Sequence, residues 1–493
     1  MLPPGAAGRS YDRRLTRRVP DIVERVVGGH GRWIALVGGL ALLVRLPLLT
    51  AQGAVTAGDG PVYFTVAHSL LDGNWLQGND YRTPGYPIAL TPALLADRVL
   101  GRGEAELVLG AQNLLGILLA VAILLVGARY FRLWVGVAAG LLAAISPVLL
   151  TLERLTYPDL LYGCGLLAGA VLLAEAAVRG DDRRWLAASG IAFGLTAYVK
   201  PAAQALLIAP LLVLLLSTRN LRRAALGGAV AAAAMLLTMS PWLIHNATKG
   251  TAGMSEQSGL TLFYRAFDDD RYAVPTDVRY GPEMRRLQLR HGSRAHERLW
   301  SRTWEYLDDR RLSQPEAFEV MGDAASTAVR RHAGTYALRS ADDVRRSVTD
   351  LADPSPGDWE GFDYFGDLHA KLDAARVGIP PPGVVWALVQ VGLGLGVAWI
   401  VVTLGGLAAL ALPFAADLRV RAAGSALLVT WLVAALTTAL GHGSLWRYSA
   451  GLAPLAWLGG LAGAWLVWTK AYTHTLADHH APARHWRGAQ SQR

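Results

Sequence analysis

The chain has 493 residues, of which 53% are hydrophobic and only 17% are charged. This composition excludes an ordinary soluble domain of this size, because the polar share is too small. The net charge of +9 would suit a nucleic-acid-binding protein. The arginines, however, gather at the ends of apolar runs and in one long polar segment, and no nucleic-acid-binding motif occurs. The apolar runs are about 18 to 25 residues long, which predicts an integral membrane protein.

The chain begins with a basic tail, residues 1–32, followed by the apolar run 33–50. That run is long for a signal peptide and contains Arg45, so we expect an uncleaved first membrane helix behind a cytoplasmic tail. Because Arg45 lies near the outer end of this helix, its side chain should face the helix bundle or extend to the interface.

A dense polar segment, residues 57–87, follows the first apolar run. If a helix starts at Pro61, Tyr63 and Ala67 share one face and Asp59 stands at the N-terminal end. The free backbone N–H groups of a helix start stabilise a carboxylate, so Asp59 should stay ionised and able to act as a base. A plain helix cap is the alternative for this residue.

The apolar runs predict about ten spanning helices. Arginine-rich loops fall on one side together with both termini, and the positive-inside rule assigns that side to the cytoplasm. The apolar run 86–96 is rich in proline, and a full span there would reverse every later loop. We therefore expect it to be an interfacial or re-entrant segment. The expected spans are 33–50, 108–128, 133–150, 160–178, 185–199, 201–217, 221–243, 384–413, 421–440 and 447–468.

This topology predicts an all-α polytopic bundle with a mainly helical extracytoplasmic segment. That segment is too long for a plain connector, so we expect a small folded cap or an acceptor-binding lid. The predicted parts are the tail 1–32, an N-terminal module 33–243 with its first outer loop 51–107, the cap 244–383, C-terminal helices 384–468 and a cytoplasmic tail 469–493.

Within the expected cap, one helix is marked by local signals. Ser313 and Glu316 have the spacing of a capping box, and Gly334 is expected to end the helix. An apolar stripe between these signals is formed by Phe318, Met321, Ala325 and Val329.

Charged residues recur at the outer ends of the expected spans, at Asp59, Asp159, Lys200 and Arg447. Each has a structural explanation, as a helix-start carboxylate, a lysine at a turn or an interface anchor. Together, two carboxylates and two cations suit a site where a hydroxyl is deprotonated and a phosphate leaves. The histidines show no metal-ligand spacing. The single cysteine, Cys164, excludes an intramolecular disulfide and lies in an apolar run, where we expect it to pack.

Several short motifs occur in a characteristic order. They are Asp59-x-x-x-Tyr63, RTPGYPIAL at 82–90, YPD at 157–159, VKP at 199–201, PWLIHN at 241–246 and WRYSAGLAPL at 446–455. This order resembles the GT-C type membrane glycosyltransferases that depend on polyprenyl-phosphate sugars, which include the protein O-mannosyltransferases and the lipid A aminoarabinose transferases. The resemblance extends over about residues 33–468, except for the external segment 250–380.

The resemblance implies inverting transfer of a sugar from a polyprenyl-phosphate donor to an acceptor hydroxyl. On this basis Asp59 acts as the catalytic base or orients it. Asp159 is the second carboxylate, with Glu153 as the alternative. Lys200 stands where arginine is frequent and lacks the bidentate fork of a guanidinium. Lys200 and Arg447 are expected to hold the lipid phosphate. The expected substrate-binding residues are Tyr63, Arg82, Tyr86, Lys200, Arg447 and Tyr448.

On this interpretation no metal is required, although a divalent cation held by Asp59, Asp159 and the phosphate remains an alternative. The expected acceptor is a lipid, a glycan or a protein, and the expected location is a bacterial plasma membrane with an extracytoplasmic site. A flippase or transporter of a lipid-linked sugar is the alternative function, because buried charges facing a bundle suit it equally. The sequence shows no internal repeat, and the long external segment favours an enzyme. A scaffold whose carboxylates only cap helices is a third interpretation.

Overall fold

The computed structural model is almost entirely helical in the residues that it describes, and no β-sheet occurs among them. The predicted all-α membrane architecture is therefore confirmed. The residues described are 29–46, 59–74, 82–249, 253–255, 257–291, 299–349, 407–442 and 446–480.

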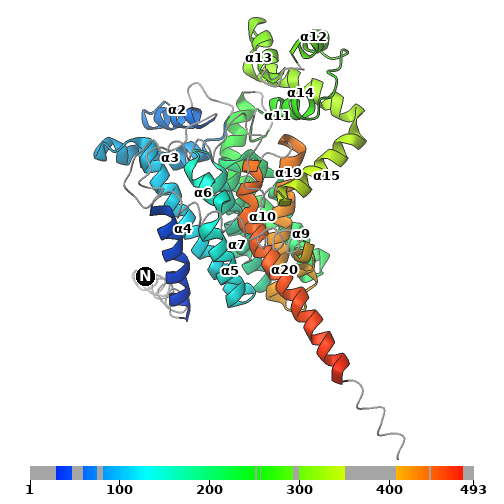
Figure 1. The fold of residues 1–493 in the computed structure, drawn as a ribbon. Helices are drawn as coiled ribbons and strands as arrows, with labels where there is room; N and C mark the ends of the chain where they lie inside the picture. The colour runs from blue at the N-terminus through cyan, green and yellow to red at the C-terminus, as the bar shows by residue number, and fades with distance from the viewer. Residues whose placement is uncertain are drawn as a thin grey trace, which may run out of the picture.

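Most long helices run side by side as a bundle (Figure 1). α10 packs along α8 and α9, α4 packs along α5, and α7 lies between α8, α19 and α20. The bundle consists of the helical residues 29–46, α4 (Glu104–Tyr130), α5 (Leu133–Ile145), α6 (Pro147–Arg154), α7 (Asp159–Val178), α8 (Arg183–Val199), η1 (Pro201–Ile208), α9 (Ala209–Thr218), α10 (Leu221–Thr248), α19 (Leu418–His442) and α20 (Trp446–His480).

Six helices of the described part of the chain are long and apolar enough to cross a membrane, or seven if α5 and α6 form one broken span. The predicted number of about ten spans is not confirmed. α8 has only 17 residues, and most of the predicted span 384–413 lies outside the described residues.

The predicted span 133–150 is broken rather than continuous, which corrects the sequence-based expectation. α5 ends at Ile145, Ser146 is extended with ψ 120°, and α6 starts at Pro147. The two pieces are bent by 48°. A residue before proline is disfavoured in the helical conformation, which explains the break at this position. α6 then ends at Arg154, five residues before α7 begins at Asp159.

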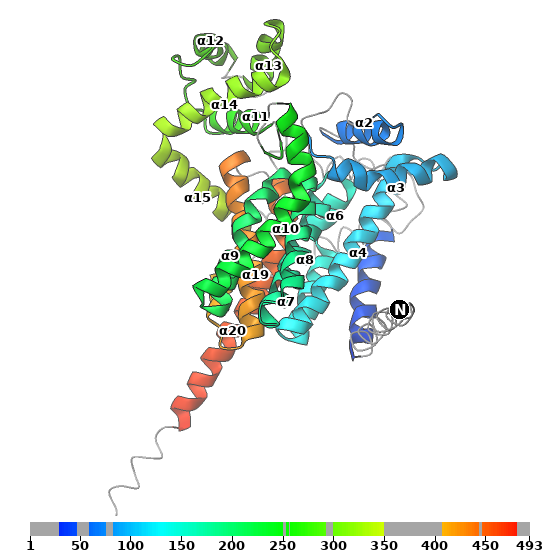
Figure 2. The same ribbon diagram turned by 180° about the vertical axis from the view of Figure 1, so that it is seen from behind.

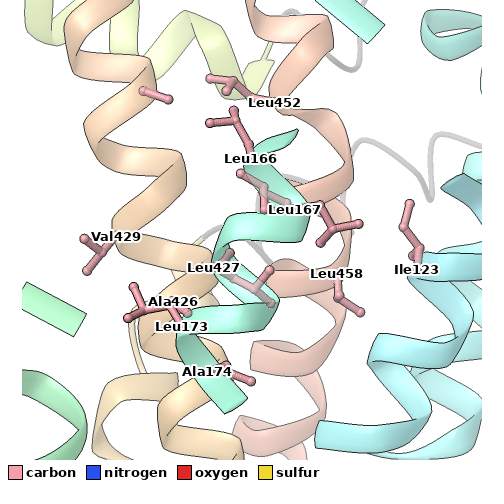
Figure 3. Packing of buried hydrophobic residues seen from close by; sticks show 14 of the residues in the cluster. Ile123, Leu166, Leu167, Leu173, Ala174, Ala426, Leu427, Val429, Leu452 and Leu458 are labelled. Atoms are coloured by element: carbon pink, nitrogen blue, oxygen red, sulfur yellow. The ribbon is translucent and has the colours of Figure 1, made fainter. Parts of the chain in front are cut away.

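The centre of the bundle is packed from leucine, alanine and glycine. At Gly163 of α7, a side chain could not be accommodated, because its Cβ would lie 2.5 Å from the carbonyl oxygen of Gly451 in α20. Small residues at such a crossing let two helix backbones touch. Below this crossing α7 packs between α19 and α20, as Figure 3 shows for Leu166, Leu167, Leu173, Ala174, Ala426, Leu427, Val429, Leu452 and Leu458.

Two short helices, α2 (Gly60–Leu71) and α3 (Gly85–Leu100), lie across one end of the bundle instead of along it (Figures 1 and 2). α3 buries Tyr86 and Leu90 and exposes Ile88, Leu95 and Val99. This arrangement fits the interfacial segment expected at 86–96, because an amphipathic helix at a membrane surface exposes one apolar face.

A layer of short helices lies beyond the same end of the bundle and has its own apolar core. Its last helix, α15, contacts α19 and α20, and the Tyr336 hydroxyl donates a hydrogen bond to the carbonyl of Leu440. We call this layer the cap. Its helices are α11 (Ser258–Phe263), the π-helix η2 (Tyr264–Asp269), α12 (Gly281–His291), α13 (Leu299–Asp309), α14 (Gln314–Arg331) and α15 (Ala333–Thr349).

The expected cap helix is present, with one difference at its end. The capping box of Ser313 and Glu316 is confirmed, and Phe318 and Met321 are buried on the predicted stripe. The expectation that Gly334 ends this helix is wrong. α14 already ends at Arg331, and Gly334 lies in the first turn of α15.

The arginine-rich turns meet at the opposite end of the bundle. Arg129 at the end of α4 and Arg179 after α7 both bind the carboxylate of Glu175. Arg421 at the start of α19 donates to the carbonyl of Ser217 at the end of α9. The loops that the charge pattern grouped on one side are therefore neighbours in the structure.

Candidate active site

Asp59 stands directly before α2 but does not cap it. Its side chain makes no hydrogen bond to the helix start and instead accepts one from Arg82 Nη2 at 2.7 Å. Arg82 also donates to the hydroxyl of Tyr63 at 3.0 Å and stacks over the Tyr63 ring. The Asp59 side chain is 36% exposed, whereas that of Arg82 is 12% exposed. The structure thus presents Asp59 as an accessible carboxylate held by a largely buried guanidinium.

Tyr63 and Tyr86 form the wall behind this pair. The two rings meet edge to face with centroids 5.1 Å apart, and both side chains are buried. Burial, together with the neighbouring Tyr63 and Asp159, raises the pKa of the Tyr86 hydroxyl well above its usual range. That hydroxyl therefore stays protonated, and it donates to Oε1 of Gln112 at 2.9 Å.

The second carboxylate, Asp159, is the first residue of α7. Its Oδ1 accepts a hydrogen bond from Lys200 Nζ at 2.7 Å, and the Nζ lies 5.1 Å from the centre of the Tyr162 ring. The side chains of Asp159 and Lys200 are only 2% and 11% exposed. Lys200 reaches this position because it is extended between α8 and the Pro201 that begins η1. Burial strengthens the attraction between the two charges.

Two close backbone approaches bring the Asp59 and Asp159 segments together. A Cβ added to Gly60 would lie 2.4 Å from Oγ1 of Thr156, so the start of α2 touches the segment that precedes Asp159. A Cβ added to Gly85 would lie 2.5 Å from the carbonyl of Tyr198, so the start of α3 touches the residues before Lys200. The segments carrying the predicted carboxylates and two of the predicted cations therefore form one cluster at one end of the bundle.

Glu153, the alternative second carboxylate, is paired with Arg45 in the interior of the bundle. Both of its oxygens accept from Arg45, at 2.7 and 2.5 Å, and neither side chain is exposed. Arg45 also donates to the carbonyls of Ala41 and Ala144. The expectation that Arg45 faces the bundle is confirmed. Gly116 leaves the room for this pair, since a Cβ there would lie 1.9 Å from Glu153 Oε1.

Arg447 and Tyr448 lie in the first turn of α20, and their side chains are outside the described residues. The backbone nevertheless places this turn. A Cβ added to Gly451, one turn further on, would lie 3.0 Å from the carbonyl oxygen of Asp159. The start of α20 is thus a neighbour of the start of α7.

Sequence reasoning missed Gln112. It lies in α4 within an apolar run, and its side chain connects Tyr86 with the backbone carbonyls of Glu153 and Leu155. The available signal was the pair Gln112–Asn113, the only amide side chains that interrupt this run. No group of three or more histidine, cysteine, aspartate or glutamate residues in the described part of the chain is placed to hold a metal ion.

Comparison with known protein families identifies part of the chain. Residues 93–245 match the family described as dolichyl-phosphate-mannose-protein mannosyltransferase. The match covers less than half of the chain and includes α4 to α10 with Asp159 and Lys200. The matched part contains two of the motifs on which the resemblance to GT-C type glycosyltransferases rests, YPD at 157–159 and VKP at 199–201. No curated protein matches the chain.

Solved structures with a related arrangement come from two proteins. The oligosaccharyltransferase AglB from Archaeoglobus fulgidus, in complex with an inhibitory peptide and a dolichol-phosphate, is 14% identical with a TM-score of 0.46, covering 92% of this chain and 52% of that one. ArnT from Cupriavidus metallidurans bound to undecaprenyl phosphate is 17% identical with a TM-score of 0.37, covering 83% and 77%. Its apo form is 18% identical with a TM-score of 0.35, covering 84% and 78%. The chain spans about half the length of AglB.

Proposed function

We propose that the protein transfers a sugar from a polyprenyl-phosphate donor to an acceptor hydroxyl, with inversion at the anomeric carbon. The reaction takes place at the bundle end that carries α2, α3 and the cap, on the extracytoplasmic face of the membrane. The observation that supports this best is the cluster of two carboxylate–cation pairs, Asp59 with Arg82 and Asp159 with Lys200.

Asp59 is the base in this proposal. Its carboxylate accepts the proton of the acceptor hydroxyl while the hydroxyl oxygen attacks the anomeric carbon and the bond to the phosphate oxygen breaks. A carboxylate suits this role when it is ionised, accessible and oriented, and Asp59 is both partly exposed and held by Arg82. Attack from the face opposite the phosphate inverts the configuration in a single step.

The leaving phosphate needs neutralisation more than protonation. Lys200 and Arg447 supply that positive charge, with Arg82 holding Asp59 and the wall formed by Tyr63 and Tyr86 excluding water. Fixed cations in a desolvated site stabilise developing negative charge without rearranging at the moment of reaction. Tyr448 follows Arg447 at the start of α20 and completes the proposed donor site.

Asp159 orients Lys200 rather than serving as a second base. Its carboxylate is almost fully buried and already bonded to the ammonium group, which leaves it poorly placed to meet an acceptor. Glu153 has no role in this mechanism, because both oxygens hold Arg45.

The cap covers the same end of the bundle and is the proposed place for a lipid, glycan or protein acceptor. The reaction as proposed requires no metal ion. Treatment of the purified protein with EDTA should leave the transfer rate unchanged, and restoration of a lost rate by added Mg²⁺ or Mn²⁺ would contradict a metal-free mechanism.

The direct test is transfer of radiolabelled sugar by the purified chain in detergent, with a panel of polyprenyl-phosphate sugars and a panel of acceptors. We expect a glycosylated acceptor whose anomeric configuration, read by NMR, is opposite to that of the donor. A product that retains the donor configuration would exclude the single displacement. Movement of a lipid-linked sugar across vesicles without any product would favour the flippase instead.

A further inference from the structure

We propose that Gln112 is a positioning residue that fixes the segment of Asp59 relative to the segment of Asp159. This inference rests on the proposed function. Gln112 lies in α4, its side chain is buried, and it touches neither carboxylate. Its hydrogen bonds go to Tyr86 and to the residues before Asp159, and Tyr86 contacts the Asp59 segment through the ring of Tyr63. None of the roles assigned above uses Gln112.

The amide of Gln112 makes three hydrogen bonds to two other parts of the chain. Its Oε1 accepts from the Tyr86 hydroxyl in α3 at 2.9 Å. Its Nε2 donates to the carbonyls of Glu153 at 2.8 Å and Leu155 at 2.9 Å. Only an amide offers one acceptor and two donors in this plane, so glutamate, leucine and methionine cannot make the same set.

One branch of this network leads to Asp59. Tyr86 meets Tyr63 edge to face, Tyr63 accepts from Arg82, and Arg82 donates to Asp59. The position of the Tyr86 ring therefore sets the position of the guanidinium that holds the proposed base.

The other branch leads to Asp159. The carbonyls of Glu153 and Leu155 belong to the end of α6 and the residues after it, four to six positions before Asp159. A short, buried segment transmits a displacement at Leu155 to the start of α7. The two segments also touch directly, where Gly60 meets Thr156. Gln112 thus bonds directly to the residues before Thr156 and is connected to the helix that begins at Gly60 through Tyr86 and Tyr63.

A crosslinking experiment tests the relative position of the two segments without any substrate. In a Cys164→Ala background, Gly60→Cys and Thr156→Cys place two Cβ atoms about 3.7 Å apart, inside the range of about 3.5–4.5 Å found in disulfides. We expect rapid oxidation to a crosslink with copper phenanthroline. Adding Gln112→Met, which keeps the volume and removes all three hydrogen bonds, should slow crosslinking about tenfold, as expected for losing buried hydrogen bonds.

The matched control is Asn113→Leu. Asn113 is the neighbouring buried amide of α4, but its Nδ2 bonds only to the carbonyl of Leu109 in the same helix. This variant should crosslink at the parental rate. Equal crosslinking rates in the Gln112→Met and Asn113→Leu backgrounds would overturn the inference, whether or not the protein proves to be a glycosyltransferase.

Kinetics supply the second readout. Gln112→Met should lower kcat about 100-fold, the size of effect that a misplacement of about 1 Å produces, with the donor KM changed little. Tyr86→Phe breaks the same connection on the α3 side, so the double variant should be less impaired than the product of the two single effects. Independent, multiplying effects, or a loss confined to KM, would contradict positioning. Absence of transfer by the parent protein would count against the proposed function and leave the crosslinking result to decide this inference.

Discussion

At the scale of single residues, Asp59 shows how a side-chain contact separates two explanations. A helix cap and a catalytic base both place a carboxylate before Pro61. In the structure the carboxylate turns away from the free N–H groups of α2 and binds Arg82. The cap would explain the position of Asp59, but not this orientation.

Asp59→Asn tests the assignment of the base. The amide keeps an acceptor for Arg82 but takes up no proton at neutral pH, so turnover should fall roughly 10²–10⁴-fold with little change in donor binding. Single-turnover transfer and a thermal unfolding curve would measure the two quantities. Transfer at the parental rate by a folded Asp59→Asn protein would end the assignment. Asp159→Asn is the companion variant and tests whether the second carboxylate takes over the role of the base.

Arg447→Ala tests the donor site. Losing a charged partner from a desolvated contact with phosphate costs about 2–5 kcal/mol, so donor affinity should fall by a factor of tens or more. Titration with a non-transferable polyprenyl phosphate measures this directly. Arg419→Ala, at the opposite end of the bundle, is the control and should bind the lipid as the parent does. Parental affinity in Arg447→Ala would leave this arginine as an interface anchor.

The sequence pointed to individual candidate residues but not to the residues with which they pair. Asp59, Asp159 and Lys200 stand out because they are charged at the ends of apolar runs. Their pairing could not be predicted, since it joins residues that are 23 and 41 positions apart through contacts between helices. Gln112 gave an even weaker signal, because a single buried amide in an apolar helix has no periodicity of its own.

At the scale of elements, apolar runs located most helices, whereas proline and glycine decided how they join. The expected span 133–150 missed the break that Pro147 imposes before α6. The approach of α3 to the end of α8 is likewise a property of two backbones. It depends on Gly85 having no side chain.

Gly85→Ala should separate α3 from α8. The added Cβ would lie 2.5 Å from the carbonyl carbon and oxygen of Tyr198 and 2.7 Å from the nitrogen of Val199. Backbone atoms cannot move aside cheaply, and such overpacking costs about 1–3 kcal/mol. We expect a lower midpoint of thermal unfolding in detergent and slower transfer. Gly110→Ala, where nothing lies within 4 Å of the added Cβ, is the control. Equal behaviour of the two variants would refute this contact.

At the scale of the whole molecule, the two ends of the bundle differ in kind. One end carries α2, α3, the cap and the cluster of paired charges (Figure 2). The other carries arginines bound to Glu175 and to helix-end carbonyls. The fold class followed from the length of the apolar runs. The core of the cap could not be predicted in this way, because its short helices are amphipathic and bury their apolar faces mainly against one another.

Labelling tests which end faces the cytoplasm. Single cysteines at Ser258, in the cap, and at Arg183, at the start of α8, are introduced into the Cys164→Ala protein. The arginine distribution predicts that a membrane-impermeant maleimide added to intact cells modifies position 258 and spares position 183. Both positions should react after the membrane is opened. Modification of 183 alone in intact cells would invert the proposed orientation.

The buried pair of Arg45 and Glu153 also has a consequence for biosynthesis. Arg45 leaves the ribosome 108 residues before its partner. An unpaired arginine opposes insertion by about 2.5–3.5 kcal/mol at the centre of a membrane helix and by part of that near its end. The first helix should therefore integrate weakly until α6 arrives. In nascent chains truncated after residue 145, a cysteine at Leu36 should react with a membrane-impermeant maleimide, whereas in chains truncated after residue 180 it should be protected. A Glu153→Gln chain of the longer length should behave like the shorter one, because it lacks the carboxylate that pairs with Arg45 and completes insertion of the first helix.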